Sequence, residues 1–152
     1  MCDFDPIPTS MKLASSLIVT GLLMLTPAWA ALSVKVDEPK LTGSKAVIKL
    51  TMTSTFTNKV ESARAVAFVV DEKGKVLGQT AQWVIGGGPD KPALEPNKPS
   101  PYFFVVPLDK TPSSTNSVKA KVSFIRLVLE GGQQVDASKE VTVESSSAGA
   151  AK

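Results

Sequence analysis

The amino-acid sequence predicts an all-β fold: a single immunoglobulin-like antiparallel β-sandwich of about seven strands, preceded by a signal peptide. Three observations predict it. Apolar and polar residues alternate with a period of two along almost the whole chain after residue 30. Glycine, proline and short polar segments interrupt this alternation at regular intervals. Threonine and lysine occupy most of the polar positions of this alternation, and aliphatic residues occupy the apolar positions. This is typical of sheets that have one face in a core.

The first half of the chain contains three expected strands. Residues 32–36 alternate between apolar and polar side chains and predict the first strand. Residues 48–57 place aliphatic side chains on one face and a row of threonines on the other, so we expect a long half-buried strand there. Residues 63–70 are apolar on both faces except for Arg64, which is typical of a central strand.

A hairpin and a long loop follow. Asp71-Glu72-Lys73-Gly74 has the residues of a tight turn, and residues 76–85 predict the returning strand with a bulge at Gly78. Residues 86–101 contain three consecutive glycines and five prolines, so we expect a long surface loop. A loop of this length can cross between two sheets, which favours a sandwich over a closed barrel.

The last third of the chain predicts three further strands. Residues 102–106 form a short apolar strand that ends at Pro107. Residues 118–129 alternate, but the apolar phase slips between Ser123 and Arg126, which indicates a bulge. The glycine pair at 131–132 predicts a hairpin turn, and the final strand is expected to end at residue 143.

Residues 11–30 have the pattern of a secretory signal peptide. Lys12 precedes an uncharged apolar run at 13–25, and Ala28-Trp29-Ala30 places small residues where signal peptidase reads them. We therefore expect cleavage between Ala30 and Ala31. The alternative, an uncleaved membrane anchor, is disfavoured because a spanning helix needs about 20 apolar residues.

The expected domain organisation follows from this signal. Residues 1–10 carry two acids and two prolines where a signal peptide should be basic, so we interpret them as a misassigned upstream extension, with translation starting at Met11. We expect a β-sandwich domain over residues 31–143 and a disordered tail over 144–152. Export predicts a periplasmic or secreted location, and the only cysteine, Cys2, lies before the signal.

The composition excludes most catalytic chemistry. The chain has no histidine, which excludes serine–histidine triads, cysteine–histidine dyads and imidazole zinc sites. A net charge of +3 is too weak for a nucleic-acid-binding surface. We therefore expect no enzyme activity, no catalytic residue, no metal and no cofactor.

Part of the chain resembles a known family. The run at 63–78, followed by Leu94-Glu95-Pro96-Asn97 and an aromatic strand, resembles the small bacterial exported sandwich domains of FxLYD type. The resemblance covers about residues 46–107 and departs at 68–71, which lacks the tyrosine of the family motif. It implies the sandwich fold and carries over no site residues.

The candidate binding residues lie at the long loop. Trp83 and Tyr102 flank it and Lys91 lies within it, so the two aromatic side chains either pack in the core or bind a ligand at the loop base. Lys119 and Lys121 form a basic strip, which is either a solvated face or guard of an edge strand, or a contact surface for an anionic envelope polymer or an acidic partner.

The leading hypothesis is a non-enzymatic, exported binding or scaffolding module of the bacterial envelope. Its partner is expected to be another envelope or extracellular protein, bound through loops or through strand addition at a sheet edge. The alternative is a carbohydrate or small-ligand binding module that uses Trp83 and Tyr102. A long, uncharged edge strand would favour the protein partner, whereas an exposed Trp83 beside a groove would favour the ligand.

Overall fold

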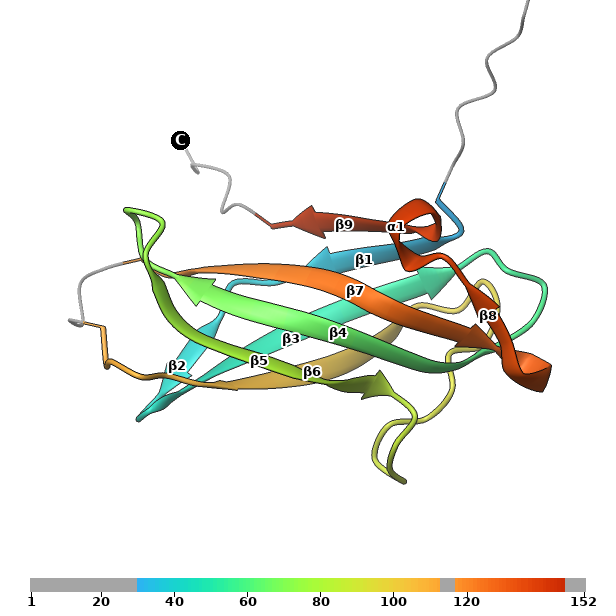
Figure 1. Cartoon of the computed structure of the whole chain (residues 1–152), viewed down its shortest axis with the longest axis horizontal. Helices are drawn as coiled ribbons and strands as arrows, with labels where there is room; N and C mark the ends of the chain where they lie inside the picture. Colours follow the sequence, from blue (N-terminus) through green and yellow to red (C-terminus); the bar gives the residue numbers. More distant parts are fainter. Residues whose placement is uncertain (1–29, 113–116, 147–152) are drawn as a thin grey trace, which may run out of the picture.

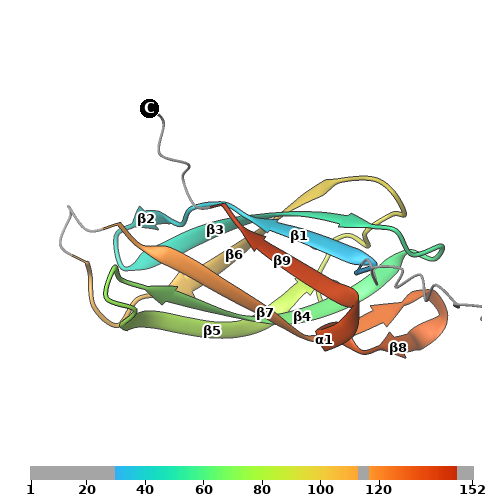
Figure 2. The same cartoon turned by 90° about the horizontal axis from the view of Figure 1, so that it is seen from above.

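The computed structural model describes residues 30–112 and 117–146. These residues form nine strands, one short helix and one 3-10 turn, arranged as two sheets packed face to face (Figures 1 and 2). The strands are β1 (Leu32–Val36), β2 (Lys40–Thr42), β3 (Lys45–Ser54), β4 (Val60–Val70), β5 (Val76–Ile85), β6 (Ser100–Pro107), β7 (Lys119–Leu129), β8 (Gln133–Val135) and β9 (Val141–Ser145). The 3-10 turn η1 is Glu130–Gly132 and the helix α1 is Ala137–Glu140. The predicted all-β sandwich is confirmed.

The first sheet, called sheet A, is built around β3. On one side β3 pairs with β6 in antiparallel register, and on the other it pairs with β1 and the short β2. β9 pairs with the outer side of β1 in parallel register. Sheet A therefore ends at β9 on one side and at β6 on the other.

The second sheet, called sheet B, is built around β4. β4 pairs with β5 on one side and with β7 on the other, both antiparallel, which confirms that residues 63–70 form a central strand. β8 adds three residues beside the end of β7, at 127–129. Sheet B therefore ends at β5 on one side and at β7 with β8 on the other.

The core lies between the two sheets and is aliphatic. Alternate residues of β1, β3, β4 and β6 point inward and are almost fully buried, including Ile48, Leu50, Val69 and Phe104. In the described part of the chain no buried side-chain polar atom lacks a hydrogen-bond partner. Burial of this apolar surface stabilises the domain without an internal disulfide, because the sequence has a single cysteine.

The predicted loop crosses from one sheet to the other. β5 ends in sheet B at Ile85, and β6 begins in sheet A at Ser100. Leu94, in the middle of the crossing, is fully buried and exchanges two backbone hydrogen bonds with Val60, at 2.9 and 3.0 Å. The crossover is therefore attached to the core halfway along its length.

Both predicted bulges are present. In β5 the register shifts beside Gly78, and in β7 it shifts between Phe124 and Arg126, so that Ile125 is the extra residue. The predicted turn at Asp71 is also confirmed, because the Gly74 amide donates to the Asp71 carbonyl at 3.0 Å.

Three details of the prediction were wrong. The strands number nine, because β2 was missed and α1 divides the predicted last strand into β8 and β9. The sandwich is not wholly antiparallel, since α1 carries the chain from sheet B to sheet A, where β9 runs parallel to β1. The predicted domain end at residue 143 is two residues short, because Glu144 and Ser145 pair with Lys35 and Val36.

Several predictions fall outside the described residues. They are the upstream extension at 1–10, the signal peptide at 11–30 apart from Ala30, and the tail over residues 147–152. These remain predictions, as does cleavage between Ala30 and Ala31.

Candidate functional site

The sandwich has four sheet edges at which a further strand could pair. Within the described residues, β5, β6, β9 and the first part of β7 each have a neighbouring strand on one side only, and so do the three-residue strands β2 and β8, which are too short to offer a long edge. An unpaired edge presents backbone N–H and C=O groups, and natural proteins protect such edges with charge, proline, bulges or short length. The four edges differ in this protection.

Three of the edges carry protection. β7 has the exposed lysines Lys119 and Lys121 and the bulge at Ile125. β6 has proline at its second and last positions, 101 and 107, neither of which has an N–H to donate. β9 is only five residues long. The predicted basic strip therefore lies on an edge strand, as expected for a charged guard.

The edge formed by β5 carries neither charge nor proline. Its ten residues, V-L-G-Q-T-A-Q-W-V-I, include no charged residue. The pairing with β4 is regular from Gly78 to Trp83, and the register shifts lie at the two ends of the strand. The start of the strand is already covered, because the Asp109 amide donates to the Leu77 carbonyl at 2.9 Å, so the free edge begins at Gln79. Thr80 and Gln82, which face inward, are only half-buried, so polar side chains replace aliphatic ones along this side of the core.

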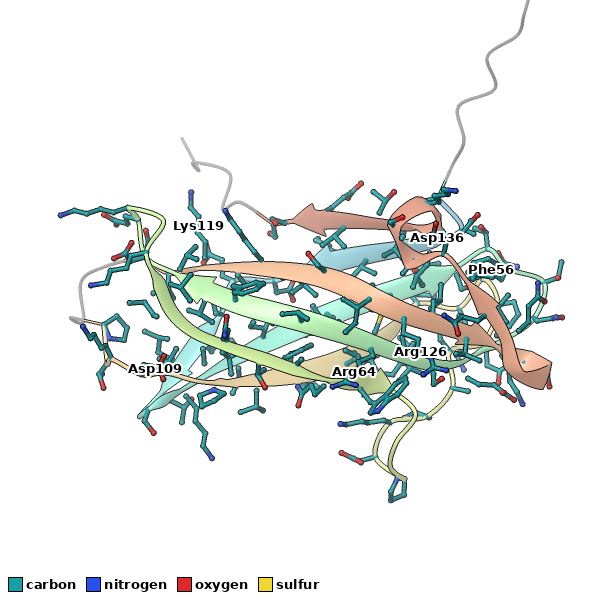
Figure 3. The ribbon with its side chains drawn as sticks, viewed as in Figure 1. Phe56, Arg64, Asp109, Lys119, Arg126 and Asp136 are labelled. Carbon is teal, nitrogen blue, oxygen red and sulfur yellow. The ribbon has the colours of Figure 1, made fainter. Side chains whose placement is uncertain are left out.

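An aromatic residue and two arginines lie beside this edge. Trp83 on β5 pairs with Arg64 on β4, and Arg64 pairs with Arg126 on β7, so the three form one row across sheet B. The guanidinium carbon of each arginine lies 6.0 Å from the centroid of the Trp83 ring, within the range of a cation–π interaction. Figure 3 shows both arginines on the outer face of sheet B, near the end of β5.

The crossover loop folds against Trp83. A side chain at Gly87, which has a φ of 82°, would come within 3.2 Å of the Trp83 Cβ atom. The loop is closed at this point by two backbone hydrogen bonds, from Gly86 to the Lys91 carbonyl at 2.9 Å and from Lys91 to the Gly88 carbonyl at 3.2 Å. The backbone of the predicted binding residue Lys91 thus shapes the loop, and its side chain is half-buried.

Tyr102 does not join Trp83 in a site. It faces inward from β6, is 5% exposed and donates a hydrogen bond from its hydroxyl to the Pro92 carbonyl at 3.0 Å. Burial raises the pKa of the phenol above its ordinary value, because the interior disfavours the charged phenolate. Of the two readings left open by the sequence, Tyr102 is a core residue, whereas Trp83 lies half-buried on the outer face.

The arginines were missed by the sequence-based search for binding residues. Arg64 had a signal, since it is the one charged residue in the otherwise apolar run at 63–70. Arg126 had none, because its position opposite Arg64 depends on the extra residue in the bulge of β7. Sequence spacing alone does not reveal a row formed by three strands.

A hollow lies at the opposite end of the sandwich from Trp83. It has a volume of about 420 Å³ and is lined by the ends of β1 and β9 and the start of β7, including Asp37, Lys119 and Lys121.

Among the described residues no group of three or more acidic, cysteine or histidine side chains is placed to hold a metal ion. No helix in the described ranges is long and apolar enough to cross a membrane.

Comparison with known proteins adds likenesses of fold alone. No family model matches the chain, and no curated protein matches it. A structural-genomics target from Bordetella pertussis, assigned as an ApaA protein, is similar with 19% identity and a TM-score of 0.44, over 68% of this chain and 84% of that one. A second structural-genomics target gives the same identity and TM-score over 68% of this chain and 76% of its own. IrmA from Escherichia coli is similar with 12% identity and a TM-score of 0.42, over 76% of this chain and 91% of that one.

Proposed function

We propose that this protein is a non-enzymatic, exported binding module of the bacterial envelope that pairs with a strand of another protein along β5. The observation that carries the proposal is the composition of β5, an edge strand of ten residues without charge or proline whose outer side is free of backbone partners from Gln79 onward. Strand addition takes its affinity from main-chain hydrogen bonds and its specificity from side chains at alternate positions. β5 offers both, since Gln79, Ala81 and Trp83 occupy alternate positions on the outer face.

The contrast with the other edges supports the choice of β5. A long edge strand without protection invites unwanted pairing, so its retention beside three protected edges is accounted for by a partner that covers it. The exported location rests on the signal pattern at 11–30, which also places the expected partner in the periplasm or outside the cell.

Glycan binding remains the alternative in a reduced form. The original hypothesis used Trp83 and Tyr102 together, and the burial of Tyr102 removes one of its two aromatic platforms. Trp83 alone on the outer face still offers a stacking surface for a sugar ring. A soluble sugar that quenched Trp83 fluorescence saturably would favour this alternative.

Site-directed photo-crosslinking in the producing cells tests the proposal. A photoreactive residue is placed at Ala81 on β5 or, as the matched control, at Ser123 on β7. Both positions are exposed and both pair with Val66, so they lie in one row on opposite sides of β4. We expect a defined protein adduct from position 81 and none from position 123.

The same experiment can contradict the proposal. Adducts from position 123 alone would transfer the interface to β7, and the absence of protein adducts from both positions would exclude strand addition on sheet B. Ala81→Lys, which gives β5 the guard that β7 already has, is expected to abolish the adduct when the probe is moved to Gln79. Ser123→Lys is its control.

A further inference from the structure

The row of Trp83, Arg64 and Arg126 places two like charges opposite each other on neighbouring strands. Arg64 and Arg126 are directly paired across β4 and β7, an arrangement that destabilises a sheet unless other interactions offset the repulsion. Both side chains are exposed, so neither is needed to fill the core. Trp83, within cation–π range of both guanidinium groups, offsets part of this repulsion, but it neutralises neither charge.

The two positive charges are directed toward β5. Neighbouring strands are about 4.8 Å apart, so Arg126 on β7 starts two strands away from Trp83 on β5. Its guanidinium carbon nevertheless lies 6.0 Å from the Trp83 ring, as does that of Arg64. The two guanidinium groups thus converge on the Trp83 ring, whose strand ends sheet B.

Neither guanidinium has a carboxylate partner in the described part of the chain. The three ion pairs found there join Lys49 to Asp37, Lys59 to Glu130 and Lys139 to Asp136. A guanidinium group presents five N–H donors in a fork that matches the two oxygens of a carboxylate. Two such groups beside the half-buried Trp83 ring offer hydrogen-bond donors and positive charge to a negatively charged planar group.

We propose that this row binds the carboxylate of a glutamate or aspartate carried by the partner strand. The inference rests on the proposed pairing along β5 and specifies the residue that the partner must supply. A strand added to β5 extends the row by one position, so its outward side chain opposite Trp83 lies against the indole ring. A carboxylate at that position meets both guanidinium groups over the ring and neutralises their repulsion.

A peptide array tests the inference on the full chain. The probes are synthetic peptides of about ten residues with alternating valine and threonine, each with one glutamate scanned through the outward positions, and a matched set with glutamine. Fluorescence polarisation measures affinity, and amide hydrogen exchange locates the bound peptide. We expect one register of glutamate to bind about tenfold more tightly than its glutamine counterpart, as for a charge-assisted hydrogen bond.

Substitutions in the protein assign that difference. We expect Arg64→Gln and Arg126→Gln each to reduce the preference for glutamate, and the double variant to abolish it. Lys121→Gln, an exposed cation on β7 in the row of Phe68, is the control and is expected to leave the preference unchanged.

The outcomes separate this inference from the proposed function. Equal binding of glutamate and glutamine peptides, with protection of β5 amides, would overturn the inference and leave pairing along β5 intact. Failure of every peptide to protect β5 amides would overturn both. Binding of a sulfated or uronic-acid oligosaccharide that depends on both arginines, without binding of any peptide, would assign the row to an anionic glycan and also overturn the inference.

Discussion

Tyr102 is a buried core residue whose side chain also makes a hydrogen bond to the crossover loop. It is the single tyrosine of the chain, it is buried, and its hydroxyl holds the crossover loop through the Pro92 carbonyl. We expect Tyr102→Phe to lower the free energy of unfolding by about 0.5–1.5 kcal/mol, because one hydrogen bond is lost and a carbonyl is left without its donor. Urea unfolding of both proteins measures the difference.

The same residue predicts a dependence of stability on high pH. Burial raises the pKa of Tyr102 in the folded state, so its contribution is fully present below the unfolded pKa of about 10 and is lost as pH rises through the folded value. Phenolate absorbance reports Tyr102 alone. We expect the stability gap between wild type and Tyr102→Phe to narrow above this pH, and a gap that widened there would contradict the assignment.

Gly78 is required where β5 approaches the end of β6. A Cβ atom at this position would clash with the Pro107 carbonyl oxygen, which belongs to the backbone and cannot move aside freely. We expect Gly78→Ala to destabilise the domain by about 1–3 kcal/mol, the range of an overpacked core. Gly131→Ala is the control, since nothing lies within 4 Å of its Cβ and its cost is limited to the strain of a positive φ. Equal losses from the two variants in thermal unfolding would contradict this account.

At the scale of elements, the short helix α1 connects β8 in sheet B to β9 in sheet A. The Asp136 carboxylate caps it, accepting hydrogen bonds from the Ser138 amide at 3.0 Å and the Ser138 hydroxyl at 2.6 Å. These bonds lower the pKa of Asp136 below its ordinary value. Its contribution is therefore present above the ordinary carboxyl pKa and is lost as pH falls through the folded value.

A variant of the cap tests its role in positioning β9. We expect Asp136→Ala to accelerate amide exchange in β9, because the turn that directs this strand to β1 is weakened. Exchange in β3 and β6 is expected to remain unchanged, since neither strand contacts α1 closely. Asp109→Ala, at an exposed carboxylate remote from α1 (Figure 3), serves as the control, and faster exchange in β9 from that variant as well would contradict the assignment.

Local patterns predicted the strands but not their neighbours. The alternation at 32–36, the turn at Asp71 and the phase slip before Arg126 are properties of short segments, and each is present as expected. The position of β5 at an edge depends on pairing between distant segments, which alternation does not encode. For the same reason the sequence could not distinguish the inward Tyr102 from the outward Trp83. The break at α1 was missed because Val135, Ala137, Val141 and Val143 continue one alternating phase through it.

At the scale of the whole molecule, the described residues form a sandwich in which the edges at β6, β7 and β9 are protected, while β5 is open to a partner from Gln79 onward. Several features gather at this edge. They are the uncharged strand β5, the crossover loop against Trp83, and the row of Trp83 with two arginines that have no carboxylate partner among the described residues. Residues elsewhere on the surface carry ion pairs of long side chains, which contribute little to stability and suggest no site.

Amide hydrogen exchange on the complex isolated by crosslinking at position 81 tests the central claim most directly. In the free protein the β5 amides that point away from β4 are expected to exchange quickly, whereas those paired with β4 exchange slowly. In the complex we expect the outward amides between Gly78 and Trp83 to become protected to a similar degree. Protection confined to β7, β6 or the loops, with the outward amides of β5 still exchanging quickly, would contradict the account.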